Sequence, residues 1–132
     1  MADVHITPVT PIMTAIPSSG YCQAASVSAD SRLVFVSGQI PVDENGVVPE
    51  DFEAQCRQVW TNVFAALAAA GMTRENIVKV TTFLSDREYR AANSAVRREL
   101  LGDHEPAVTV IITGIYDEAW LLEIEVVAAA AG

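Results

Sequence analysis

The side chains best suited to chemistry lie in the last apolar segment of the chain. Glu123 and Glu125 alternate there with apolar residues, and in a β-strand this period places both acids on one face. The opposite face would carry Leu122, Ile124, Val126 and Ala128. Glu123 could act as a general base or orient a water molecule. It could equally be a polar residue on a partly wet sheet face, and for Glu125 an interface or solvent role is the expectation.

Three further side chains could bind a small ligand. Ser37 interrupts an apolar segment just before Gly38, but no His/Asp pattern accompanies it, so a covalent nucleophile is not expected. Its hydroxyl could bind a ligand or be structural. Tyr21 could close a cleft or pack as an interface aromatic. Asn93, in the middle of an expected helix, could touch ligand, although capping of a loop or strand is the stronger interpretation.

Cysteine and histidine offer no metal site. Cys22 and Cys56 stand alone without a CxxC pair, and His5 and His104 are far from both in sequence. We expect Cys22 to be a small strand residue and Cys56 to lie in the core of a helix. No metal and no cofactor are therefore expected.

Charge disfavours nucleic acid as a partner. The chain carries 8 basic and 17 acidic residues, for a net charge of −9, whereas a phosphate-binding surface needs clustered basic groups. The densest basic stretch is expected on a solvated helix face; it comprises Arg87, Arg90, Arg97 and Arg98. No apolar run is long enough for a spanning helix. The N-terminus shows no signal peptide, so the expected location is the cytoplasm.

Composition indicates an oligomer. Hydrophobic residues make up 51% of the 132 residues, which is high for one small domain covering residues 1–132. Because an exposed apolar patch on a monomer promotes aggregation, the excess is expected at a subunit interface.

Patterning predicts a mixed α+β domain. Residues 21–27, 33–40, 77–84, 107–113 and 121–129 are expected strands, with a hairpin turn at 28–32 and a tight turn at Asn45-Gly46. A helix is expected from Glu50 to Ala70. A second should start at a capping box formed by Ser85 and Glu88, run to about Leu101 and end at Gly102.

Two helices can cover only one face of such a sheet. The uncovered face is expected to hold apolar residues and to form the oligomer contact; its expected members are Val108, Val110, Ile112 and Val127.

From about residue 16 to the end, the sequence resembles the Rid family, the reactive intermediate deaminases also called YjgF-like or L-PSP endoribonuclease-like proteins. The segments that carry the resemblance are Tyr21-Cys22-Gln23-Ala24, VSGQIP at 36–41, Ala69-Ala70-Gly71, IVKVT at 77–81, Asn93, Glu105-Pro106-Ala107 and LEIE at 122–125. They occur in the family's order and at nearly its spacing.

The resemblance implies a chorismate-mutase-like fold, a mixed six-stranded sheet with two helices on one face. It also implies a homotrimer with a small-molecule cleft at each subunit junction. Characterised members hydrolyse 2-imino acids and their enamine tautomers. By correspondence, Glu123 would act on the hydrolytic water, and Tyr21, Ser37, Gly38 and Asn93 would contact the substrate.

The family's carboxylate-binding arginine is absent. Its position is occupied by Val108, and the family's cysteine position by Val110. Without this charge-assisted hydrogen bond, we expect poor activity on 2-imino acids and a substrate without a carboxylate. Another arginine, such as Arg32 or Arg87, could reach a neighbouring subunit's cleft and replace it.

Three functions are compatible with these features. The first is hydrolysis of an imine, enamine or related C=N compound with Glu123 as the catalytic residue. The second is a non-catalytic trimer that binds a metabolite or supports a pathway enzyme. Ribonuclease activity, the third, is disfavoured by the charge and by the lack of a histidine pair.

Overall fold

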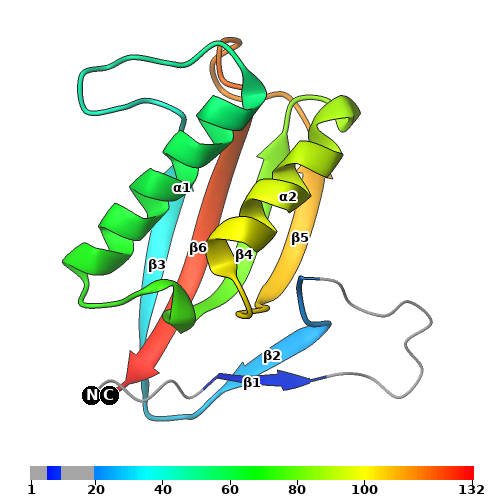
Figure 1. The fold of residues 1–132 in the computed structure, drawn as a ribbon. Coiled ribbons are helices and arrows are strands. Elements are labelled where there is room, and N and C mark those ends of the chain that lie inside the picture. The colour runs from blue at the N-terminus through cyan, green and yellow to red at the C-terminus, as the bar shows by residue number, and fades with distance from the viewer. Residues whose placement is uncertain (1–5, 10–19) are drawn as a thin grey trace.

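The computed structural model describes residues 6–9 and 20–132, which form a two-layer α+β domain (Figure 1). Four strands make the main sheet in the order β3-β6-β4-β5, and a separate two-stranded sheet pairs β1 with β2. The strands are β1 Ile6–Val9, β2 Ala24–Val27, β3 Ser31–Gln39, β4 Ile77–Leu84, β5 Ala107–Ile112 and β6 Leu122–Ala131. The helices are α1 Phe52–Ala69 and α2 Arg90–Leu101, with short 3-10 turns η1 Arg74–Asn76 and η2 Arg87–Tyr89.

The main sheet is mixed, as expected. Strand β6 pairs antiparallel with β3 and β4, and β4 pairs parallel with β5. Both helices cover one face, α1 in front of β3 and β6 and α2 in front of β4 and β5 (Figure 1). Within the described part of the chain, neither helix is long and apolar enough to cross a bilayer.

The expectation of one six-stranded sheet with a β2–β3 hairpin was wrong. Strand β2 pairs instead with β1, Ile6 lying opposite Val27. A turn closed by the Ser31 amide and the Ser28 carbonyl, 3.1 Å apart, sends β3 away from β2. Strand β1 was not foreseen because Pro8 interrupts it, and proline is tolerated in a strand only at an edge.

Helix α1 confirms its predicted position to within two residues at each end. The Asp51 side chain caps the start by accepting a hydrogen bond from the Ala54 amide at 3.1 Å. Its inward face forms the centre of the core and is fully enclosed; the residues are Cys56, Val59, Trp60, Val63 and Leu67. Gly71 follows with φ +75° and ends the helix.

The second helix begins later than predicted. The Asp86 carboxylate, not the Ser85 hydroxyl, accepts the hydrogen bond that opens the segment, from the Glu88 amide at 2.9 Å. The first turn is a 3-10 turn, and α2 proper starts at Arg90. Gly102, with φ +59°, ends it as predicted.

The assignment of side chains to the two sheet faces was partly right. Leu122, Ile124, Val126 and Ala128 meet the helices, as predicted. Val108 and Ile112 were predicted on the uncovered face, but both pack against the core on the helical side. The parallel register pairs Val108 with fully buried Val80. Other apolar residues lie on the uncovered face, among them Phe35, which is 73% exposed.

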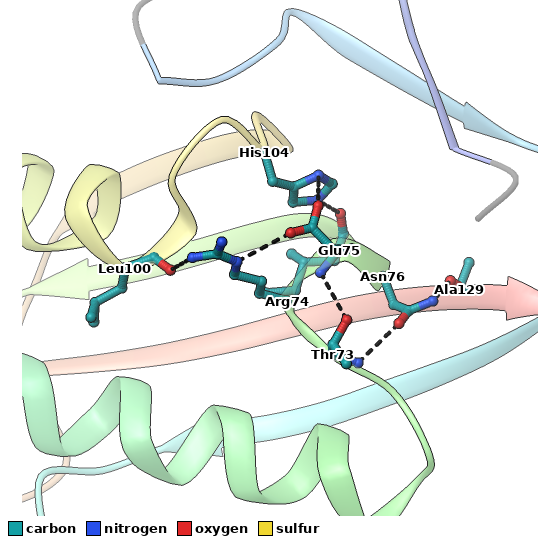
Figure 2. Close-up of polar contacts among 8 residues, drawn as sticks. Thr73, Arg74, Glu75, Asn76, Leu100, His104 and Ala129 are labelled. Atoms are coloured by element: carbon teal, nitrogen blue, oxygen red, sulfur yellow. Dashed lines mark hydrogen bonds and ion pairs between the residues drawn. The ribbon is translucent and has the colours of Figure 1, made fainter. Parts of the chain in front are cut away.

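A polar network joins the turn after α1 to the end of α2 (Figure 2). The Asn76 side chain accepts from the Thr73 amide and donates to the Ala129 carbonyl, both at 2.9 Å. The Arg74 guanidinium donates to the Leu100 carbonyl at 2.8 Å. Because Leu100 lies within one turn of the C-terminal end of α2, these bonds fix how α2 lies over the sheet.

Candidate functional site

A β-bulge places Glu123 against Gly38. Val36 pairs with Val126 and Gln39 pairs with Ile124, so Ser37 and Gly38 together lie opposite Glu125 alone. Such a bulge redirects the side chains beside it and often occurs next to active sites. A methyl group at Gly38 would lie 2.8 Å from the carboxyl carbon of Glu123 and in still closer contact with Oε2. Glycine is therefore the only residue type that, at position 38, leaves the Glu123 carboxylate in place.

The surroundings of Glu123 leave its carboxylate available to a ligand. Glu123 is half-buried and lies opposite Phe83 on the uncovered face of the sheet. The salt bridges among residues 6–9 and 20–132 involve other acids, namely Glu53, Glu75 and Glu99. Ser37 is exposed on β3 beside Gly38. The structure thus brings Glu123 and Gly38 together, and Ser37 precedes Gly38 on β3.

Tyr21 lies at a different corner of the molecule. The Gly20 amide donates to the Glu105 carboxylate, and the Cys22 amide donates to the Pro106 carbonyl, both at 3.0 Å. Gly20 also packs closely against the side chain of Arg98. These contacts hold half-buried Tyr21 where α2 ends and β5 begins.

Val108 and Glu123 are not part of one cleft within a single chain. Val108 pairs with Val80, whereas Glu123 pairs with Phe83, three residues further along β4. Three residues correspond to about 10 Å along a strand, and β5 and β6 are two strand spacings of about 4.8 Å apart. Successive residues of a strand point to opposite faces, so this offset of three residues also puts the side chains of Val108 and Glu123 on opposite faces of the sheet. Val110 is 40% exposed on the edge strand.

Asn93 lies inside the domain. It is 2% exposed, and its Oδ1 lies 4.0 Å from the Cys56 sulfur on the facing helix. Burial raises the pKa of Cys56 to about 12 and also raises the pKa of Cys22. A thiolate is the nucleophilic form of cysteine, so neither residue is suited to nucleophilic chemistry, and Cys56 is confirmed as a core residue.

Arg97 is a further residue whose position was predicted wrongly. It was predicted on a solvated face with Arg98, but it is only 4% exposed, whereas Arg98 is exposed. The one signal in the sequence was its spacing of four from Asn93, which puts the two on the same side of α2.

The chain is similar to known proteins over nearly its whole length. The family model described as Endoribonuclease L-PSP matches residues 13–130. A 2-iminobutanoate/2-iminopropanoate deaminase of Salmonella typhimurium is 37% identical over 100 residues, 73% of this chain and 78% of that protein.

Two solved structures share the fold. The Rid family protein YyfB of Yersinia pestis superposes with a TM-score of 0.83 at 24% identity, covering 95% of this chain and 98% of that one. E. coli TdcF with bound serine superposes with a TM-score of 0.70 at 32% identity, covering 85% and 89% respectively.

Proposed function

We propose, because this chain belongs to the Rid family of L-PSP endoribonuclease-like proteins, that it hydrolyses the C=N bond of a small imine or of its enamine tautomer. The observation that carries the proposal is the contact between Glu123 and Gly38 across the bulge. It fixes a carboxylate on the uncovered sheet face, against the backbone of Gly38, the residue that follows Ser37. The Salmonella relative is a deaminase of 2-iminobutanoate and 2-iminopropanoate, and its reaction is chemistry of this class.

In the proposed reaction, Glu123 accepts a proton from a water molecule as that water attacks the imine carbon. The C=N π electrons move to nitrogen, which takes up a proton from solvent, and a carbinolamine forms. Glu123 then returns its proton to the nitrogen, the C–N bond breaks, and ammonia leaves as the hydroxyl releases its proton to solvent and becomes a carbonyl. Imine and water are thereby converted to a carbonyl compound and ammonia. Ser37 and the Gly38 backbone orient the substrate.

We place the complete site between copies of the chain, in a homotrimer. Two features support this. Tyr21 and Glu123 lie at different corners of one chain, so a second copy is needed to bring both to one ligand. The uncovered sheet face around Glu123 also carries large exposed apolar side chains, including Leu33 at 46% and Phe35 at 73%. Such a surface is typical of an interface.

Cleavage of RNA is not part of the proposal, although the family model carries that name. The net charge of −9 opposes binding of a polyanion. His104 already bonds the Ile77 carbonyl at 2.7 Å, and His5 lies outside the described residues.

The test is a hydrolysis assay of the wild-type protein with 2-iminopropanoate, 2-iminobutanoate and the imine of pyruvamide, which lacks a carboxylate. The imines are generated in situ, and release of the carbonyl product is compared with the rate in buffer. We expect acceleration of at least one of the three. A folded protein that accelerates none of them would contradict the proposed function.

A further inference from the structure

The contact between Gly38 and Glu123 lies where the pairing of β3 with β6 is weakest. Gly38 is the second-last residue of β3, and Glu123 is the second residue of β6. The bulge interrupts the ladder between the two strands at this point, between Val36 and Gln39. Ends of elements fray unless other contacts hold them. Because a catalytic group must be held to within about 0.5 Å, this contact needs support from outside the β3–β6 ladder.

Helix α1 binds the end of β3 through Asn62. The Asn62 side-chain amide donates to the Ile40 carbonyl at 2.8 Å and to the Val42 carbonyl at 3.1 Å. Gln58, one turn earlier on α1, donates to the Asn62 Oδ1 at 2.9 Å and so keeps the amide nitrogen turned toward these carbonyls. Ile40 follows Gly38 by two residues, so Asn62 holds the chain directly beyond the bulge.

The same helix binds the start of β6 through Gln55. Gln55 is 1% exposed, and its Oε1 accepts a hydrogen bond from the Leu121 amide at 2.8 Å. Its Nε2 donates to the Ala119 carbonyl at 3.0 Å and to the Pro49 carbonyl at 2.7 Å. Leu121 precedes Glu123 by two residues, so Gln55 fixes the point at which β6 begins.

The spacing of the three amides joins these contacts into one support. Gln55, Gln58 and Asn62 lie three and four residues apart, on one side of α1, and α1 lies in front of both β3 and β6 (Figure 1). Burying an amide as deeply as that of Gln55 is costly unless its polar atoms are bonded. Each side-chain bond of Gln55 goes to a segment that adjoins β3, β5 or β6, and a single helix thereby sets the positions of both strand ends.

We propose that Gln55 and Asn62 are positioning residues for Glu123, which hold the start of β6 and the end of β3 so that the Glu123 carboxylate stays against Gly38. This inference rests on the proposed function, because the group that they position is the proposed general base. Neither side chain touches the substrate. A misplacement of about 1 Å can lower a rate about 100-fold, so loss of the Gln55 contacts should lower kcat more than it raises KM.

The kinetic test compares Gln55→Met with Asn76→Leu. Methionine has the length of glutamine but makes none of its side-chain hydrogen bonds. Asn76 is also buried, at 4% exposed, but its amide binds Ala129 near the far end of β6. At a temperature where both variants are folded, Gln55→Met should lower kcat at least about tenfold and Asn76→Leu less than about twofold. Losses of kcat that only follow the loss of melting temperature in both variants would overturn the inference.

A double variant separates positioning from general destabilisation. In a Glu123→Gln background, Gln55→Met should lower the melting temperature as it does in the wild type, but it should not lower the remaining kcat further. A further loss of kcat in that background would mean that Gln55 acts on the reaction by a route other than Glu123, and would overturn the inference.

A third measurement needs no turnover. In NMR spectra of isotope-labelled protein, the Glu123 carboxyl signal, identified by its loss in Glu123→Gln, and the Gly38 amide signal report on their contact. Both should shift in Gln55→Met and in Asn62→Leu, a milder change at a half-buried position, but not in Asn76→Leu.

The outcomes separate the two proposals. Shifted signals in a wild-type protein that hydrolyses no imine would leave the support of Glu123 by α1 standing and remove the proposed reaction. Imine hydrolysis by the wild type, with both signals unmoved in Gln55→Met and Asn62→Leu, would overturn the positioning role and leave the proposed function intact.

Discussion

Glu123→Gln is expected to lower kcat for imine hydrolysis by at least about 100-fold, the lower range for loss of a general acid–base group. Glutamine keeps the shape and volume of the side chain and its contact with Gly38, but it cannot accept the proton of the attacking water. KM should change little, because Glu123 is proposed to act on the water. Initial rates over a range of imine concentrations measure both constants.

The matched control is Glu125→Gln. Glu125 lies two residues further along the same strand and on the same face, but it is exposed, and no close contact with Gly38 involves it. Its substitution should leave kcat within a few-fold of the wild type. Equal losses in the two variants would point to the charge of the sheet face rather than to a catalytic carboxylate, and full activity in Glu123→Gln would contradict a catalytic role for Glu123.

Gly38→Ala is expected to abolish most of the activity while the protein stays folded. The added methyl group would lie 2.8 Å from the carboxyl carbon of Glu123 and 3.1 Å from its Cγ. The colliding atoms belong to the end of a flexible side chain, so Glu123 can rotate away at a cost of about 0.5–1.5 kcal/mol in rotamer strain. The carboxylate then no longer lies against Gly38, and kcat should fall about as far as in Glu123→Gln.

A double-variant cycle tests whether the effect of Gly38→Ala on kcat depends on Glu123. If Gly38 acts only by leaving room for Glu123, then Gly38→Ala should have little further effect in a Glu123→Gln background. Gly114→Ala is the control, because a methyl group there meets no atom within 4 Å and its φ is not positive. Additive losses in the double variant would mean that Gly38 has a role independent of Glu123.

Local sequence patterns predicted those elements whose boundaries are set locally. Strand β4 covers the predicted residues 77–84, and α1 differs by two residues at its start and by one at its end. The apolar face of β6 was predicted from alternation alone, and the family was identified from short motifs that the family model confirms over residues 13–130. These features need no knowledge of distant contacts.

The errors concern long-range contacts. The face on which Val108 lies depends on the register between β5 and β4, and the partner of β2 depends on a segment with Pro8 that resembles no strand. The inward turn of Arg97 depends on how α2 is rotated over the sheet. Arg97 and Arg98 are neighbours in sequence, and only packing decides which of the two leaves water.

Imine hydrolysis is proposed to take place in a site shared by two copies of the chain, with Glu123 from one copy and Tyr21 from the other. Glu123→Gln and Tyr21→Ala, each of low activity alone on the imine that the wild type hydrolyses, should therefore complement each other when unfolded and refolded together in equal amounts. Random assembly would restore both groups in about a quarter of the sites of a cyclic homotrimer. Recovery of about that fraction of wild-type activity is the predicted result. Mixed oligomers that form but stay as inactive as the separate variants would contradict it.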